Sequence, residues 1–205
     1  MTHLPIGLKR VGVFGGAFDP PHVAHAALVQ TALDVFNLDE LRLVPTGLAW
    51  HKVRPLSSAS HRLAMCHLAF GQIPKLVIDP REISRSGPSY TVDTLRELSG
   101  EFPCAELFLI MGGDQARALA SWRDWREILR LAIICVAERE AATGANPSFS
   151  APVGLESRFR PLHLPAMSVS ATDIRSRIAA QHSVATLVIE PVARYIDEHH
   201  LYQTI

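Results

Sequence analysis

The stretch Gly12–His25 reads GVFGGAFDPPHVAH and decides how the rest of the sequence is interpreted. Its apolar start runs into Gly15 and Gly16, which permit a tight turn and let an anion approach the main chain without a Cβ in the way. Two prolines follow, and proline is tolerated just before or at the first turn of a helix. A helix is therefore expected to begin near His22, with unpaired first amides that favour negative charge.

The two histidines of this stretch lie three residues apart, so His22 and His25 are expected on one face of the first helical turn. Two imidazoles beside free amides would make a compact set of donors for phosphate oxygens. A helical histidine pair can also bind metal, but it needs further ligands, and only Asp19 is near in sequence. Spacing alone leaves phosphate binding, metal binding and coincidence open. The stretch matches neither GxGxxG nor GxxxxGK[ST].

The composition sets limits on size and partners. A chain of 205 residues with 48% hydrophobic content is expected to form a single domain over 1–205. Lysine plus arginine equals aspartate plus glutamate at 20 each, so there is no bulk positive charge for a nucleic-acid partner. No apolar run approaches the roughly 20 residues of a membrane span, and the N-terminus lacks the apolar region of a signal peptide. We expect a cytoplasmic protein without nucleic-acid or membrane partners, either a monomer or a homo-oligomer.

Three cysteines, Cys66, Cys104 and Cys135, lie far apart without CxxC spacing. Each has apolar neighbours in the sequence. They are predicted to be buried free thiols in a reducing compartment rather than redox or metal-binding groups.

Apolar runs that suit buried strands alternate with segments of helical periodicity. Strands are predicted at 10–14, 41–45, 75–79, 107–114, 131–138 and 160–165, and helices at 22–36, 58–70, 91–100, 122–130, 170–180 and 190–200. This order predicts an α/β fold, a Rossmann-like doubly wound parallel sheet with helices on both faces. Both glycine pairs, at 15–16 and 112–113, fall at strand ends, where such sheets bind ligands.

The pattern is interrupted once. Residues 139–160 are rich in glycine, proline, serine and asparagine, which is typical of a surface loop. We predict that this segment is mobile.

Five segments carry a family resemblance. GGAFDPPHVAH resembles the GGxFDPxHxGH signature of the HxGH nucleotidyltransferases. VPTGLAWHK, REISRSGPSYTVDTL, MGGDQARALASWRDWREIL and SVSATDIRSRI are similar to later segments of the bacterial nicotinate-nucleotide adenylyltransferases, and the C-terminal PVARYIDEHHLY also fits. The resemblance covers nearly the whole chain, from Val11 to Tyr202, with its motifs in the family's order.

The resemblance implies transfer of the adenylyl group of ATP to nicotinate mononucleotide, giving deamido-NAD and pyrophosphate in NAD biosynthesis. The acceptor phosphate is itself the nucleophile in that family, so no serine or cysteine nucleophile is required. Catalysis reduces to aligning two polyanions and stabilising the charge that develops at the α-phosphorus. Mg²⁺ is implied as a cofactor that arrives with ATP, without dedicated protein ligands.

On the ATP side, the resemblance implies a cluster of imidazoles, cations and small residues, with His25 as the main transition-state donor. The implied catalytic residues are His22, His25, Lys52 and Arg175, and the implied ATP-binding residues are Gly15, Gly16, Phe18, His22, His25, Ser170, Thr172 and Arg175. Ser170 is also typical of a plain helix N-cap, since Asp173 follows three residues later.

On the acceptor side, the implied nicotinate mononucleotide-binding residues are Lys52, Tyr90, Thr91, Gly112, Asp114, Trp122 and Arg123. Trp122 would stack on the pyridine ring, while Thr91 and the Arg123 amide would hold the carboxylate. Asp114 would bind a ribose hydroxyl. Standing alone, two tryptophans three apart on a helix, Trp122 and Trp125, are more often core aromatics, and Trp125 is expected to be core.

Three positions depart from the family pattern: Ala17, Ala24 and Ala171 stand where threonine, glycine and serine are usual. None removes a charge or an imidazole, so activity is expected to survive. The methyl group of Ala24 is expected to narrow the space for adenosine.

Other functions remain open at this point. The acceptor in adenylyl transfer could instead be nicotinamide mononucleotide or phosphopantetheine. A dinucleotide-binding oxidoreductase and a non-catalytic nucleotide sensor are the alternatives from other classes, opposed by the missing GxGxxG motif and by the intact His22, His25, Lys52 and Arg175.

Overall fold

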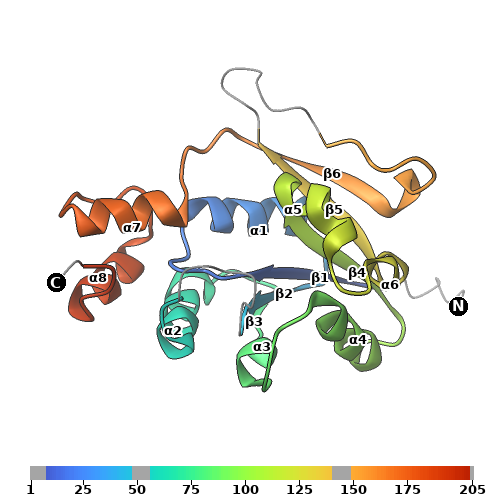
Figure 1. The fold of residues 1–205 in the computed structure, drawn as a ribbon, viewed down its shortest axis with the longest axis horizontal. Coiled ribbons are helices and arrows are strands. Elements are labelled where there is room, and N and C mark those ends of the chain that lie inside the picture. Colours follow the sequence, from blue (N-terminus) through green and yellow to red (C-terminus); the bar gives the residue numbers. More distant parts are fainter. Residues whose placement is uncertain (1–7, 48–55, 140–148, 204–205) are drawn as a thin grey trace, which may run out of the picture.

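The computed structural model describes residues 8–47, 56–139 and 149–203 and contains one six-stranded sheet (Figure 1). All neighbouring strands pair in parallel, in the order β3-β2-β1-β4-β5-β6. The strands are β1 (Lys9–Gly16), β2 (Glu40–Pro45), β3 (Leu76–Ile78), β4 (Ala105–Gly112), β5 (Ala132–Arg139) and β6 (Phe159–Leu164). The predicted doubly wound parallel sheet is confirmed.

Successive side chains of a strand point to opposite faces of the sheet. Each strand therefore contributes apolar side chains to both faces, and helices bury both. In β4, Leu107, Leu109 and Met111 belong to one hydrophobic core, while Phe108 and Ile110 belong to another on the opposite face. Helices α1 (Val23–Val35) and α2 (Ala59–Phe70) cover the face of Phe108. Helices α4 (Thr91–Glu101), α5 (Gly113–Ala118) and α6 (Trp125–Leu131) cover the other face, and α1 and α4 lie on opposite sides of the sheet in Figure 1.

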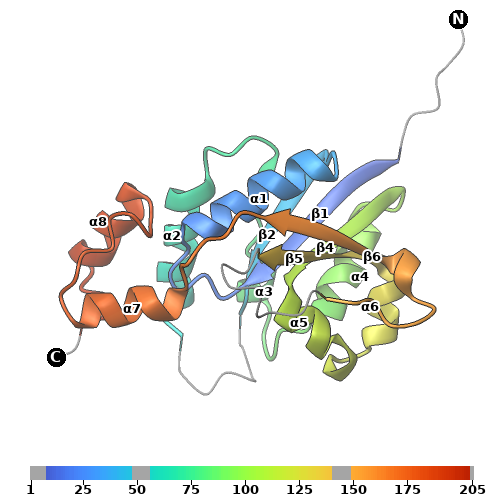
Figure 2. The same cartoon turned by 90° about the horizontal axis from the view of Figure 1, so that it is seen from above.

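The last two helices form a separate layer. Helices α7 (Ala171–Ala179) and α8 (Glu190–Glu198) lie at one end of the molecule, on the left in Figures 1 and 2. They bury a third core with the start of α1 and with α2, in which Ile174 and Val192 pack with Met65. Their ranges are close to those expected from the sequence.

The helices within the described ranges include none that is long and apolar enough to cross a membrane.

The chain around the two tryptophans differs from the prediction of one helix over 122–130. A 3-10 helix, η1 (Leu119–Ser121), precedes Trp122, and α6 begins only at Trp125. Asp124 lies between them with φ of 49°, a left-handed conformation that interrupts the helix. Trp122 and Trp125 therefore do not share a helix.

Two loops also contain short helices. The polar segment after β3 includes α3 (Arg81–Ser84), and η2 (Glu156–Arg158) precedes β6. Of the predicted mobile loop, residues 140–148 lie outside the described residues. The main-chain N–H of Phe149, just beyond them, donates to Glu138 Oε1 at 2.7 Å. Mobility of 139–160 stays a prediction.

The cysteines are all free thiols, but they do not share one environment. Cys66 and Cys135 are buried as predicted. The prediction was wrong for Cys104, which is exposed because it lies in the turn between α4 and β4.

Candidate active site

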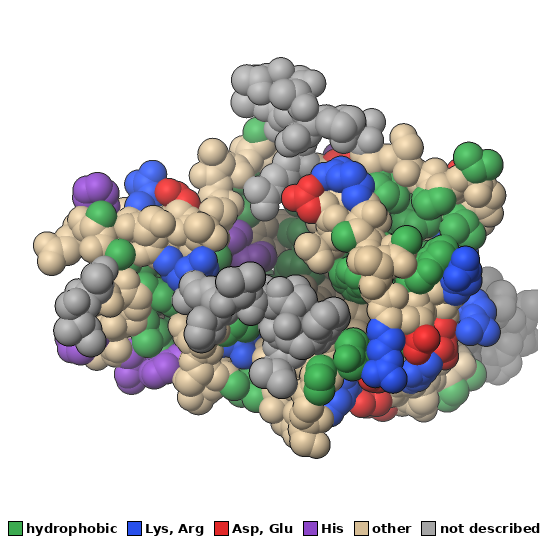
Figure 3. All heavy atoms as spheres, viewed as in Figure 1, with side chains coloured by type: hydrophobic (Ala, Val, Ile, Leu, Met, Phe, Trp, Pro, Cys, Tyr) green, Lys and Arg blue, Asp and Glu red, His purple; other side chains and the backbone are tan. Residues whose placement is uncertain are grey.

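The strand order places a topological switch point between β1 and β4, where chain connections leave toward opposite ends of the sheet. In such sheets ligands bind beyond the carboxyl ends of the strands at this point. β1 ends at Gly16 and β4 at Gly112, so both glycine-containing ends border the same crevice. Figure 3 shows a hollow near the middle of the molecule, between the positions of α7 and α5 in Figure 1, with histidine side chains at its border.

In the loop after β1, Gly16 lies in close contact with the ring of Phe18. Phe18 adopts φ of 47° and is 2% exposed. A Cβ on Gly16 would lie 2.9 Å from Phe18 Cζ, so no side chain fits there without moving the ring. Gly15 is exposed and open, its virtual Cβ meeting only Val44 O at 4.0 Å. Any contact between Phe18 and ATP must therefore come from the main chain, because the ring packs below the site.

His22 and His25 lie together at the start of α1, as their spacing predicted. His22 is the N-cap and is 6% exposed, whereas His25 is half-buried. The rings stack with centroids 3.7 Å apart, and the main-chain N–H of His22 donates to His25 Nδ1 at 3.2 Å. Because Nδ1 accepts this bond, neutral His25 carries its proton on Nε2. Nε2–H of His25 is thus a donor on the side of the ring away from the main chain.

Aromatic packing holds the His25 ring in place. Phe18 meets it edge-on at 5.1 Å between centroids, and Phe14 lies at 6.0 Å. A donor held by packed neighbours needs little reorganisation when charge develops nearby.

The first amides of α1 are not all free, contrary to the prediction. Val23 N–H donates to Leu187 O at 3.1 Å, and His25 N–H donates to His22 O at 2.9 Å. The segment before α8 therefore takes up one of the helix-start donors.

Arg175 in α7 binds the loop at residues 15–25 that carries the GGAFDPPHVAH signature, here called the signature loop. The two segments are far apart in sequence. Arg175 Nη1 donates to Asp19 O at 2.7 Å and its Nη2 to Thr172 Oγ1 at 3.1 Å. Ser170 is the N-cap of α7, and its hydroxyl accepts from Asp173 N–H at 3.1 Å. The capping role of Ser170 is confirmed, and the exposed hydroxyls of Ser170 and Thr172 lie on the helix turn that presents Arg175.

A buried polar network under the loop was missed by sequence reasoning. Asp19 and Arg62 are each 2% exposed. Asp19 Oδ1 accepts from Tyr202 Oη at 2.6 Å, and Asp19 Oδ2 accepts from Ser57 N–H at 3.3 Å. Arg62 donates from Nη1 to Ala17 O and from Nε to Ser57 O, both at 3.0 Å. An aspartate in an otherwise apolar loop was the available signal, since a buried carboxylate needs partners.

The ionisation of this network follows from its burial. Burial raises the pKa of the Tyr202 hydroxyl well above its usual range, and the Asp19 carboxylate adds to that shift. Burial lowers the pKa of Arg62, while the negative charge of Asp19 opposes the change. Tyr202 is therefore a neutral donor and Asp19 its acceptor.

On the acceptor side, four of the predicted residues lie close together. Tyr90 is the N-cap of α4 and Thr91 its first residue. Tyr90 and Trp122 both pack against the core that lies under α4 and α6. The Arg123 guanidinium lies over the Tyr90 ring, 4.6 Å from its centroid. This group offers an aromatic surface, a hydroxyl and a cation.

The end of β4 presents two further predicted residues. Gly112 is the N-cap of α5, with nothing within 4 Å of the Cβ that a larger residue would add. Asp114 lies in the first turn of α5 with its side chain 90% exposed, paired with Arg117. The Asp114 carboxylate is accessible to solvent at this end of the sheet, and Arg117 is a cation that sequence reasoning did not single out.

Two further predictions concern Lys52 and Mg²⁺. Lys52 lies outside the described residues. Among residues 8–47, 56–139 and 149–203 there is no group of three or more His, Cys, Asp or Glu side chains that could hold a metal ion. The role of Mg²⁺ stays a prediction.

The effect of Ala24 on the adenosine site stays a prediction, but the structure shows where its methyl group packs. Ala24 is buried in the third core, beside Met65 and the helices α7 and α8. Its methyl group therefore faces the C-terminal layer. Ala17 supplies the carbonyl that Arg62 binds, a role that does not depend on its side chain.

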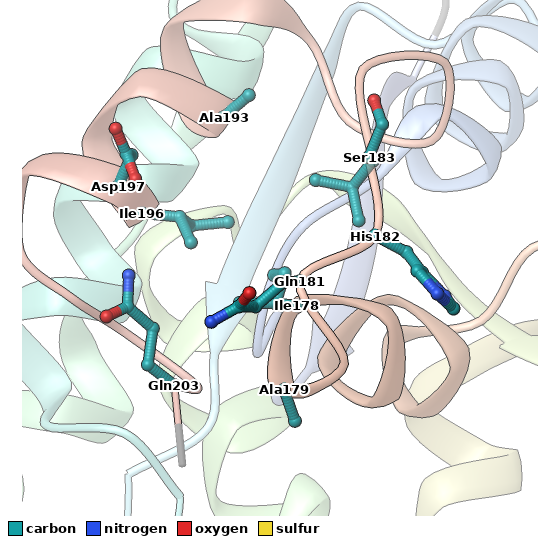
Figure 4. Close-up of a pocket in the computed structure, with 10 residues that line it drawn as sticks. Ile178, Ala179, Gln181, His182, Ser183, Ala193, Ile196, Asp197 and Gln203 are labelled. Atoms are coloured by element: carbon teal, nitrogen blue, oxygen red, sulfur yellow. The ribbon is translucent and has the colours of Figure 1, made fainter. Parts of the chain in front are cut away.

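A separate cavity of about 520 Å³ lies between α7 and α8 (Figure 4). It contains none of the predicted site residues. Its lining is Ile178, Ala179, Gln181, His182, Ser183, Val184, Ala193, Ile196, Asp197 and Gln203.

Comparisons with known proteins show which family this chain belongs to. A family model described as cytidylyltransferase-like matches residues 13–177. The probable nicotinate-nucleotide adenylyltransferase of Albidiferax ferrireducens is 66% identical over 197 residues, covering 96% of this chain and 100% of the relative. The protein of the same name from Methylibium petroleiphilum is 43% identical over 198 residues, covering 95% and 92%.

A solved structure has the same fold. Plasmodium falciparum nicotinic acid mononucleotide adenylyltransferase, complexed with NaAD, aligns with a TM-score of 0.78 at 18% identity, over 95% of this chain and 97% of that one. Given the extent of the family match and the identity to its bacterial relatives, this chain belongs to the nicotinate-nucleotide adenylyltransferases of the cytidylyltransferase-like family.

Proposed function

We propose that this protein transfers the adenylyl group of ATP to the phosphate of nicotinate mononucleotide, producing deamido-NAD and pyrophosphate in NAD biosynthesis. The observation that carries the proposal is the stacked His22–His25 pair at the β1–β4 switch point, with the proton of His25 on Nε2. The names of the bacterial relatives support the choice of reaction.

In this reaction an oxygen of the acceptor phosphate attacks the α-phosphorus of ATP, and the bond from that phosphorus to the bridging oxygen of pyrophosphate breaks. Negative charge spreads over the α-phosphate oxygens in the transition state. His25 Nε2–H donates to one of them, a type of interaction that accelerates the chemical step because the donor is already in place. Arg175, held at Asp19 O, is the cation for the departing β- and γ-phosphates.

The acceptor occupies the other side of the crevice in this proposal. Trp122 stacks on the pyridine ring, Thr91 and the Arg123 main chain hold the carboxylate, and Asp114 binds a ribose hydroxyl. The packing of Arg123 over Tyr90 supports this placement, since it joins the turn after η1 to the start of α4. Mg²⁺ bound with ATP would reduce the repulsion between the two polyanions.

The direct test is pyrophosphate release from ATP and Mg²⁺ with nicotinate mononucleotide, nicotinamide mononucleotide or phosphopantetheine as acceptor. We expect a strong preference for nicotinate mononucleotide and formation of deamido-NAD. Equal or reversed preference would leave adenylyl transfer in place. It would contradict the proposed binding of the nicotinate carboxylate by Thr91 and the Arg123 main chain. Nucleotide binding without release from any acceptor would instead support a non-catalytic nucleotide-binding protein.

A further inference from the structure

The bond between Asp19 and Tyr202 joins residues that are 183 positions apart and has no part in the reaction just described. Asp19 lies in the signature loop, three residues before the N-cap of α1. Tyr202 lies in the turn after α8, with φ of 64°, and packs against the third core. The C-terminal turn thus supplies a hydrogen-bond donor to the loop that carries the histidines.

Asp19 is held from two directions and in turn holds Arg175. Its carboxylate accepts from Tyr202 Oη at 2.6 Å and from Ser57 N–H at 3.3 Å, while its main-chain oxygen accepts from Arg175 Nη1 at 2.7 Å. A shift of the Asp19 carboxylate would therefore move the carbonyl that orients Arg175. It would also move the chain leading directly into His22.

We propose that Tyr202 is a positioning residue for adenylyl transfer, acting through Asp19 on the place of Arg175 and on the start of α1. This inference rests on the proposed function for its kinetic consequence. Its structural part, that Tyr202 orders the loop 17–25, does not depend on the reaction.

The chemistry of the pair explains why one hydroxyl matters here. Asp19 is 2% exposed, so water does not readily replace a lost donor. Arg62 supplies the compensating charge from below, but it bonds the carbonyls of Ala17 and Ser57. Tyr202 therefore orients the Asp19 carboxylate and does not neutralise its charge. Small misplacement of reacting groups is enough to reduce turnover strongly.

The test compares two tyrosine hydroxyls from the same part of the chain. Tyr202→Phe removes the donor to Asp19 and keeps the packed ring. Tyr195→Phe is the matched control, because its hydroxyl pairs with His61 Nδ1 at 3.0 Å, between α8 and α2 and away from the loop. For Tyr202→Phe we expect kcat to fall roughly ten-fold, the scale of losing one hydrogen bond to a charged group. The KM for nicotinate mononucleotide should stay unchanged, and Tyr195→Phe should retain wild-type kinetics.

A second measurement is independent of activity. Hydrogen exchange of the amides in 17–25 should be faster in Tyr202→Phe than in wild type and unchanged in Tyr195→Phe. Wild-type kcat and wild-type exchange in Tyr202→Phe would overturn the proposal. Equal losses in both variants, with equally lowered unfolding temperatures, would overturn it as well, because they would indicate general destabilisation. If the wild-type protein released no pyrophosphate, the proposed function would fail, and the exchange data alone would decide whether Tyr202 orders the loop.

Discussion

The main-chain N–H of His22 donates to Nδ1 of His25 over 3.2 Å, while the two rings stack 3.7 Å apart. One histidine of the signature thereby sets the tautomer of the other, because Nδ1 of His25 cannot carry a proton and accept this bond at once. The pair acts as a unit in which His22 is buried and His25 presents Nε2–H.

Replacement of His25 tests which ring nitrogen is used. His25→Ala is expected to lower kcat by roughly two to three orders of magnitude, the scale of losing one preorganised transition-state donor. His25→Gln should retain more activity than His25→Asn, because the glutamine amide nitrogen reaches about as far as Nε2 and the asparagine amide only as far as Nδ1. Steady-state kcat for pyrophosphate release measures all three variants.

The opposite order of the two amide variants would show that Nδ1 is the working nitrogen and that the His22 bond breaks during the reaction. Near-normal turnover in His25→Ala would remove His25 from catalysis altogether.

Replacement of Trp122 and replacement of Trp125 should affect different properties of the protein. Trp122→Ala is expected to raise the KM for nicotinate mononucleotide and to leave the KM for ATP unchanged, because the stacking surface serves only the acceptor. Trp125→Ala is the matched control, since Trp125 begins α6 and packs between the core and the Arg126 guanidinium. It should lower the unfolding temperature without changing either KM. Equal effects of Trp122→Ala on both substrates would indicate a folding defect instead of a lost acceptor contact.

The sequence predicted the strands of the sheet because each is a short apolar run, and alternation with helical periodicity implied parallel pairing. It failed at residues 122–124, which were predicted to be helical, because no hydrophobic period signals the left-handed conformation of Asp124 that precedes α6. Likewise, His22 and His25 were placed together by helix geometry, whereas the Asp19–Tyr202 bond joins distant segments that no local pattern relates. The burial of Ala24 depends in the same way on where α7 and α8 pack.

The three thiols should differ sharply in reactivity. Burial raises the pKa of Cys66 and of Cys135 to about 12, so both are protonated at neutral pH, and the thiolate is the reactive form. Cys104 is exposed. Iodoacetamide at pH 7.5 should therefore modify Cys104 alone in the folded protein and all three cysteines after denaturation, as read by mass spectrometry of peptides. Labelling of Cys66 or Cys135 at the rate of Cys104 would contradict the burial of that thiol.

A buried carboxylate predicts an unusual pH dependence of stability. Burial raises the pKa of Glu82, and the hydrogen bond from Thr94 Oγ1, at 2.8 Å, and the charge of Arg85 only partly oppose it. A group whose pKa is higher in the folded state stabilises below its unfolded pKa and loses that contribution as pH rises through the folded value. Glu82→Gln keeps an acceptor oxygen for Thr94 and removes the ionisation. Its urea midpoint should exceed that of wild type at pH 8, and the difference should shrink toward pH 4.

Glu40 provides a control of opposite sign. Burial alone would raise its pKa, but the hydrogen bond from Lys9 and the charge of Arg42 outweigh that effect and lower it. Glu40→Gln should therefore reduce the urea midpoint at pH 8, with the difference vanishing as pH falls through the lowered pKa. If Glu82→Gln behaved like Glu40→Gln, the ionised Glu82 would be a stabilising partner of Arg85, and the charge of Arg85 would outweigh the cost of burial.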